Sequence, residues 1–173
     1  MFLFVNNLPH VALSDQTAKF LSGVGTAGII WFVFGVVLFL LEEKKDHWFV
    51  LQLFVSAGAA GLVTSVLKHV VARYRPSPEM GAIIVSAARD LYSFPSGHAT
   101  LAFAGAVVLS AKEPRFQWFF YTLAFLIAFS RIYLGVHYPL DVVAGGILGF
   151  GIGRLTETVL VQVIRPTSHR LVS

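Results

Sequence analysis

The sequence predicts an all-α integral membrane protein, a bundle of five transmembrane helices, or six, with an N-terminal interfacial helix. Composition is the first observation behind this prediction, because 56% of the 173 residues are hydrophobic and only 13% are charged. A soluble domain of this length needs a more charged surface. The second observation is that apolar residues gather in long runs separated by short polar stretches. The length suits a single membrane-embedded domain over residues 1–173.

Five apolar runs are candidates for spans, because about 20 apolar residues cross a bilayer. We expect these spans at residues 21–41, 48–67, 98–111, 116–131 and 140–164. The first twenty residues carry too many polar side chains for a span, namely Asn6, Asn7, His10, Asp15, Gln16 and Lys19. We therefore expect this segment to form an amphipathic helix on the membrane surface.

Small residues indicate which helices lie at the centre of the bundle. They are concentrated at 56–61, at 102–106 and at Gly145, Gly149 and Gly153, which repeat at four-residue spacing. Small residues let helix backbones approach closely in lipid. The second, third and fifth runs are therefore expected at the centre, and the first and fourth, rich in Phe and Leu, are expected to face lipid.

The distribution of cations predicts the orientation. Alternating crossings place the polar stretches 73–96 and 134–139 on one membrane face and the turns at 42–46 and 112–115 on the other. The second face and the tail beyond it hold Lys44, Lys45, Lys112, Arg115, Arg165 and Arg170. By the positive-inside rule, the stretch 73–96 lies outside the cytoplasm.

Three polar clusters fall on that outer face. Lys68 precedes Arg75-Pro76 by seven residues, nearly two helical turns, so both cations are expected on one side of a helix end. The tetrapeptide Pro95-Ser96-Gly97-His98 precedes the third run, and Ser130-Arg131, His137 and Asp141 surround the last connection. Each cluster alone has an ordinary structural reading, as snorkelling cations, as a helix N-cap or as an acid in a first helical turn.

Phosphoryl transfer requires the residue types that these clusters contribute together. Cations and helix N-terminal N–H groups stabilise phosphate oxygens. A neutral imidazole can attack phosphorus if a carboxylate holds its other nitrogen, and a second histidine can protonate the leaving oxygen.

The three clusters resemble the three-part signature of the type 2 phosphatidic acid phosphatase superfamily, in order and without departure from Lys68 to Asp141. The resemblance implies that His137 is the nucleophile and forms a phosphohistidine, that Asp141 orients it, and that His98 is the general acid and then the base. It also implies a phosphate site without a metal or other cofactor, formed by Lys68, Arg75, Ser96, Gly97 and Arg131.

The compact chain with short loops is most similar to the small bacterial lipid A 1-phosphatase group, so lipid A 1-phosphate is the first substrate to expect. Phosphatidylglycerophosphate, undecaprenyl pyrophosphate and phosphatidic acid stay open as alternatives. The expected partners are a membrane lipid with a phosphate headgroup and the bilayer, without nucleic acid. The expected location is the bacterial inner membrane, multi-pass, with the site facing the periplasm. A rival of another class is a lipid binder or transporter that uses the basic cluster without chemistry.

Overall fold

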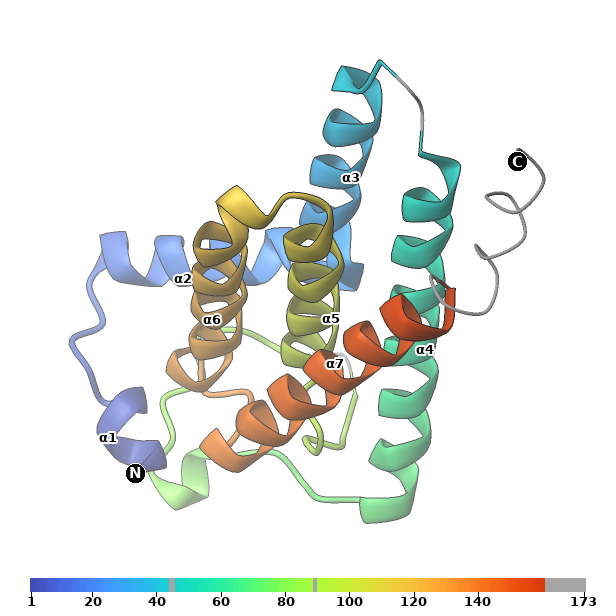
Figure 1. Ribbon diagram of the computed structural model, residues 1–173. Coiled ribbons are helices and arrows are strands. Elements are labelled where there is room, and N and C mark those ends of the chain that lie inside the picture. Colours follow the sequence, from blue (N-terminus) through green and yellow to red (C-terminus); the bar gives the residue numbers. More distant parts are fainter. Residues whose placement is uncertain (44–45, 89, 161–173) are drawn as a thin grey trace, which may run out of the picture.

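The computed structural model describes residues 1–43, 46–88 and 90–160, and the regular elements in these ranges are helices (Figure 1). The all-α prediction is therefore confirmed. The helices of four residues or more are α1 (Phe2–Asn6), α2 (Ala12–Val24), α3 (Ile29–Leu41), α4 (His47–Val71), α5 (Gly97–Lys112), α6 (Gln117–Tyr133) and α7 (Pro139–Val159). Lys44, Lys45, Arg165, Arg170 and the predicted helical residues 161–164 lie outside the described residues.

The first predicted span does not form one straight helix. Helix α2 continues into it as far as Val24, the chain breaks over the next residues, and α3 leaves at an angle of 51° to α2. Ala27 and Gly28 take positive φ angles of 51° and 73°, which a continuous right-handed helix excludes. The N-terminal segment is not the single helix predicted, because α1 and α2 are separate, and Ala18 and Ser22 of α2 are buried. Its position on the membrane surface stays a prediction.

The number of spans stays a prediction. In the described part of the chain, α4 with 25 residues and α7 with 21 are long and apolar enough to cross a membrane, and the bent pair α2–α3 is a third candidate. Helices α5 and α6 have 16 and 17 residues. At about 1.5 Å per residue they fall short of the roughly 30 Å of a hydrocarbon core.

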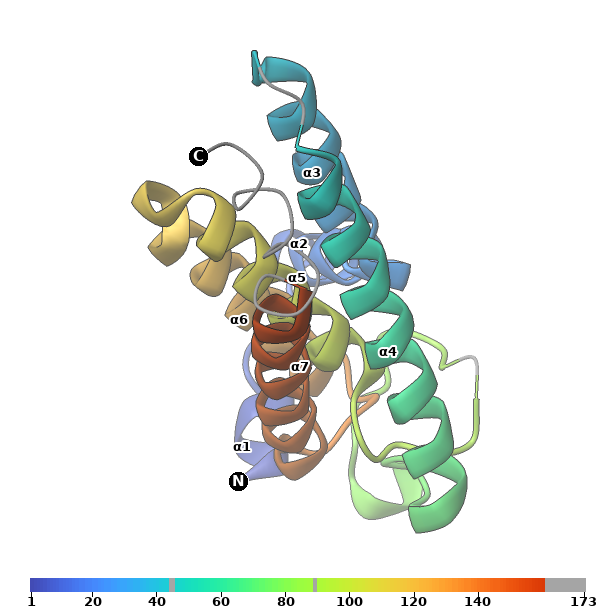
Figure 2. The same ribbon diagram turned by 45° about the vertical axis from the view of Figure 1, so that its right-hand side comes forward.

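Helix α5 lies at the centre of the bundle and packs against α4, α6 and α7, as Figure 2 shows. This confirms the central position predicted for the third run, but α6, from the fourth run, also packs against α5, with Phe120, Ala124 and Ile127 buried, so its predicted lipid-facing position is only partly met. A Cβ atom added to Gly145 would lie 2.6 Å from the carbonyl oxygen of Ser96, and one added to Gly153 would lie 2.7 Å from Val107 Cβ. The glycine stripe of α7 is thus the surface on which α5 rests.

Gly149→Ala is expected to destabilise the fold by about 1–3 kcal/mol, because its new Cβ would collide with the backbone of Thr100. Gly151→Ala is the matched control, since nothing lies within 4 Å of its Cβ position. That control should change stability by less than about 1 kcal/mol, on the stabilising side, as usual for Gly→Ala in a helix. Thermal unfolding of the purified variants in detergent measures both, and equal melting temperatures would contradict the predicted packing.

The two ends of the bundle differ in chemistry. At one end, the Lys112 ammonium at the end of α5 pairs with Glu42 and, at 3.1 Å, with Asp46. At the other end, α4 and α6 end and α5 and α7 begin, so the three sequence clusters meet there. This is the grouping of loops on one face that the sequence predicts.

A buried asparagine of α1 holds the long loop at this end of the bundle. The Asn6 amide donates to the carbonyl oxygens of Ile83 (2.9 Å) and Tyr133 (3.0 Å) and accepts from the N–H of Ile83 (2.8 Å). Its side chain is fully buried. A residue that looked like a polar interruption of an apolar run is therefore a connector between α1, the loop and α6.

Candidate active site

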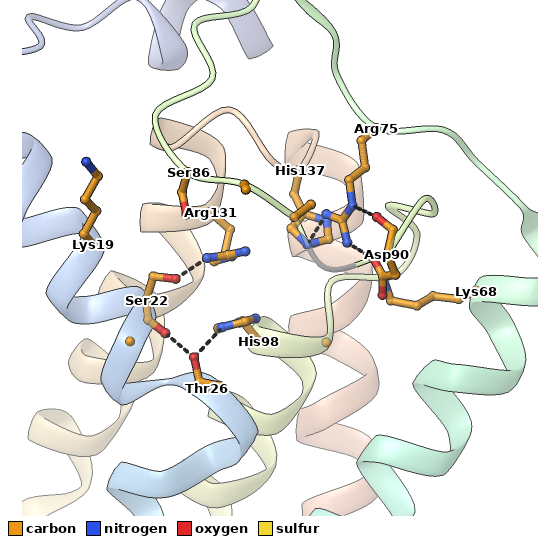
Figure 3. A pocket seen from close by; sticks show the side chains of 14 residues that line it. Lys19, Ser22, Thr26, Lys68, Arg75, Ser86, Asp90, His98, Arg131 and His137 are labelled. Atoms are coloured by element: carbon orange, nitrogen blue, oxygen red, sulfur yellow. Dashed lines mark hydrogen bonds and ion pairs between the residues drawn. The ribbon is translucent and has the colours of Figure 1, made fainter.

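A cavity of about 380 Å³ opens at the end of the bundle where the clusters meet (Figure 3). Six of its lining residues belong to the helices of the predicted site or to its loop: Lys68, Arg75, Gly97, His98, Arg131 and His137. Helix α2 adds a wall that the sequence did not suggest, with Lys19, Ser22 and Gly23, and Thr26 follows it.

His137 lies in the connection between α6 and α7 and is 2% exposed. Its Nε2 atom is 3.1 Å from Nη1 of Arg75. Because a guanidinium only donates, Nε2 is the acceptor and the ring proton belongs on Nδ1. Nδ1 faces Oδ2 of Asp141 at 3.6 Å. The Nε2 lone pair therefore points toward the cations of the cavity, and the carboxylate stands behind the ring.

Asp141 is fully buried in the first turn of α7 and has a structural role as well. Its Oδ2 accepts the backbone N–H of Tyr138 at 2.9 Å, which caps the helix that begins at Pro139. The ordinary reading of an acid in a first helical turn and the reading as partner of His137 are therefore both met by the same side chain.

Lys68 and Arg75 meet as predicted, although not on one continuous helix. Helix α4 ends at Val71, and Ala72 has a positive φ of 48°, which turns the chain before Arg75. Both cations bind one carboxylate, that of Asp90: Lys68 Nζ lies 3.1 Å from Oδ2, and Arg75 pairs through Nη2 with Oδ1. Asp90 was not among the predicted site residues.

Helix α2 and the break after it hold two further predicted residues. The guanidinium of Arg131 is 6% exposed and donates through Nη1 to the hydroxyl of Ser22. The Nε2 atom of His98 lies 3.4 Å from the hydroxyl oxygen of Thr26. That hydroxyl donates to the carbonyl oxygen of Ser22 at 3.1 Å, so its oxygen can accept a hydrogen bond from Nε2 of His98.

Ser96 is the N-cap of α5 but does not line the cavity. Its backbone N–H donates to the carbonyl oxygen of Asp141 at 2.9 Å, and its buried hydroxyl has no partner among the described residues. Gly97, the first residue of the helix, does line the cavity. Of this tetrapeptide, Gly97 and His98 at the N-terminus of α5 face the cavity and Ser96 does not, and the predicted phosphate contact stays a prediction.

Arg73 is a site residue whose role the sequence did not reveal. Its Nη1 donates to Oδ1 of Asp141 at 3.0 Å, and its guanidinium lies over the ring of Tyr138, 4.1 Å from the centroid. The buried carboxylate thus has a cation on one oxygen and a backbone N–H on the other. Arg73 follows Lys68 by only five residues, and only the tertiary structure shows that it contacts Asp141 and does not line the cavity.

Arg73→Gln is expected to destabilise the protein by about 1.5–3 kcal/mol, because a buried carboxylate loses a charged hydrogen bond. In a double-mutant cycle with Asp141→Asn the two effects should not add, since both remove the same pair. Arg154→Gln is the control, because its 2.8 Å pair with Glu157 is exposed and worth about 0–1 kcal/mol. Thermal unfolding measures all four variants, and additive losses would rule out the coupling.

Burial lowers the pKa of His137 to about 4, although the Asp141 carboxylate facing the ring acts in the opposite direction. The ring is therefore neutral, with a free lone pair, at every pH well above that value. NMR titration of ring-labelled histidine, with the signal assigned by its loss in His137→Asn, should give a midpoint near pH 4. A midpoint near the ordinary value of 6.5 would show that the ring is solvated and charged below neutrality.

The cavity therefore combines a neutral imidazole, a second imidazole, several cations and a helix N-terminus.

Residues 49–165 match the PAP2 superfamily. The undecaprenyl-diphosphatase of Sulfolobus acidocaldarius is 34% identical over 155 residues, which are 88% of this chain and 74% of that protein. The lipid A 1-phosphatase of Rhizobium johnstonii is 31% identical over 165 residues, 83% of this chain and 67% of that protein. The crystal structure of Aquifex aeolicus LpxE is similar with a TM-score of 0.71 and 28% identity, over 91% of this chain and 92% of that one. The chain belongs to the PAP2 superfamily.

Proposed function

We propose that the protein is a membrane lipid phosphatase that removes a terminal phosphate from a lipid headgroup through a phosphohistidine on His137. The observation that carries the proposal is the geometry of that residue. Its Nε2 lone pair points at Arg75 in a cavity shared with His98 and Arg131, while Nδ1 faces Asp141. A site that only binds phosphate does not need an oriented, neutral imidazole.

In the first step, Nε2 of His137 attacks phosphorus, and the bond between phosphorus and the lipid oxygen breaks. Lys68, Arg75 and Arg131 stabilise the charge on the equatorial oxygens. Asp141 stabilises the positive charge that develops on the ring of His137. His98 donates a proton to the departing lipid oxygen.

In the second step, water attacks the phosphohistidine and the N–P bond breaks. His98 is now neutral and takes the proton from the attacking water, which restores its starting state. Inorganic phosphate leaves, and His137 regains its lone pair. Every proton and bond in this cycle is handled by residues of the chain, so we expect full activity in the presence of EDTA.

Lipid A 1-phosphate is the substrate that we expect first. The support is the compact chain and the similarity to the relative in Rhizobium johnstonii, which is a lipid A 1-phosphatase. The proposed location is the inner membrane of a bacterium, with the cavity facing the periplasm.

Undecaprenyl pyrophosphate is the second candidate, and two observations favour it. The relative in Sulfolobus acidocaldarius is an undecaprenyl-diphosphatase. In addition, Lys19 of α2 lines the cavity at the end away from Lys68, where it can meet a second phosphate (Figure 3). Lys19→Gln would then reduce hydrolysis of the pyrophosphate lipid more than that of a monophosphate lipid.

The test is phosphate release by the purified protein in detergent with EDTA. The substrates are lipid A, phosphatidylglycerophosphate, undecaprenyl pyrophosphate and phosphatidic acid. Release from one lipid well above the others would identify the substrate. Absence of release from all four, together with retained lipid binding, would favour the rival class of a headgroup binder or transporter.

A further inference from the structure

The carboxylate of Asp90 occupies the place where two phosphate-binding cations converge. Arg75 binds it through Nη2, and Lys68 Nζ lies 3.3 Å from Oδ1 and 3.1 Å from Oδ2. Figure 3 shows the Asp90 side chain directed at these two cations beside His137. Phosphate oxygens and carboxylate oxygens accept the same hydrogen bonds from Arg and Lys. Asp90 therefore stands in for a phosphate oxygen pair on Lys68 and Arg75.

The backbone around Asp90 is held in place by the same residues. Arg75 Nε donates to the carbonyl oxygen of Asp90 at 2.9 Å, and Lys68 Nζ donates to that of Tyr92 at 2.7 Å. The N–H of Ser93 donates to the carbonyl oxygen of Arg73 at 2.7 Å. Since backbone and side-chain bonds act together, the loop is built to bring this carboxylate to the two cations.

Cations outnumber acids among the described residues that line the cavity. Four cations line it, namely Lys19, Lys68, Arg75 and Arg131, and Asp90 is the acid among the described lining residues. Burial of the Asp90 carboxyl opposes ionisation, but the hydrogen bonds from Arg75 and Lys68 outweigh it and hold its pKa below the usual range. The free site is therefore already occupied by one negative charge.

We propose that Asp90 is an internal competitor for Lys68 and Arg75, which lowers the affinity for every anionic headgroup by the same factor, so that a dianionic phosphate still binds and a monoanionic phosphodiester binds too weakly to fill the site. A phosphodiester would replace one negative charge on Lys68 and Arg75 with another and gain little. A phosphomonoester, or the terminal phosphate of a pyrophosphate, brings close to two charges and outcompetes the carboxylate.

The selection matters because of where the cavity lies. An open basic cavity at the level of lipid headgroups is surrounded by phosphodiester lipids, which carry the same acceptor oxygens as the substrate. Without an internal competitor these headgroups would fill the site. The inference rests on the proposed function only for the identity of the reacting group, since the charge competition concerns binding.

The test is binding of two probes that a phosphatase does not consume, inorganic phosphate at pH 8 and dimethyl phosphate. Isothermal titration calorimetry of the full-length protein in detergent gives both affinities. In the unaltered protein, phosphate should bind much more tightly than dimethyl phosphate. In Asp90→Asn, which keeps the shape and removes the charge, the affinities for both probes should rise about tenfold or more, because each probe displaces the same carboxylate from the two cations.

Two control variants distinguish competition between Asp90 and the ligand from structural support of the cations by Asp90. Glu79→Gln removes one negative charge from an exposed residue of the same loop and should leave both affinities within about twofold, as expected for a solvated surface charge. Asp90→Glu keeps the charge and should leave both affinities close to those of the unaltered protein. If Asp90→Asn instead weakens the binding of both probes, Asp90 positions the cations and the proposal is wrong; unchanged affinities also overturn it. Because no turnover is measured, these results stand apart from those of the hydrolysis test.

Discussion

Replacing His137 by Ala is expected to lower lipid phosphate release by about 10⁴-fold or more, because the reaction then has no nucleophile. Removal of the ring also leaves Arg75 and Asp141 without the group between them, as the contacts of both His137 nitrogens show. The measurement is the initial rate of phosphate release at saturating substrate, beside the circular dichroism spectrum of each protein.

His69→Ala is the matched control for this substitution. His69 is an exposed histidine at the end of α4, bonded to the carbonyl oxygen of Ser65 at 2.8 Å, and it does not line the cavity. Its removal should leave the rate within about twofold, as usual for a surface substitution remote from the chemistry. Comparable losses in both variants would mean that the nucleophile lies elsewhere.

Replacing His98 by Gln is expected to have the second largest effect, a loss of about 10²–10⁴-fold on the lipid substrate. The structural basis is its position in the cavity with Arg131 and His137, where Thr26 holds its Nε2 atom. Glutamine keeps a hydrogen-bonding group but cannot deliver a proton to an alkoxide leaving group.

The leaving group distinguishes a general acid from a residue that only shapes the cavity. p-Nitrophenolate leaves readily without protonation, so the first step should lose much less with p-nitrophenyl phosphate than with the lipid. Single-turnover rates with both substrates measure this difference. Equal losses would show that His98 has no role in proton transfer to the leaving oxygen.

The helical fold could be predicted because the apolar runs are separated by short stretches that contain charges or prolines. The order of packing followed from Gly145, Gly149 and Gly153, since glycine at four-residue spacing has few uses in a lipid-facing helix. The break in the first run was missed because its signals, Gly25 and Gly28, also occur inside ordinary membrane helices. The positive φ angles lie at Ala27 and Gly28, and Gly25 has a negative φ but packs closely, since a Cβ there would lie 2.5 Å from Ile127 Cγ2.

The cavity-lining residues of the predicted site could be named because their residue types and spacing along the chain match the three-part signature of the family. Arg73, Asp90 and Ser22 could not, because their roles depend on contacts between residues 15 to 109 positions apart in the chain. A side chain that contacts a predicted site residue from a distant segment of the chain has no recognisable spacing to that residue in the sequence. Such residues become visible only when the distances to Asp141, Lys68 and Arg131 are measured.

The central claim is that the phosphoryl group passes through His137, and trapping the intermediate tests it most directly. The protein is mixed with a ³²P-labelled lipid phosphate, quenched within milliseconds in alkali, digested and analysed by mass spectrometry. We predict an alkali-stable, acid-labile phosphoryl group on His137, absent from His137→Ala and formed by the unaltered protein in EDTA. Label on any other residue, or rapid hydrolysis with no labelled protein at any quench time, would contradict the account.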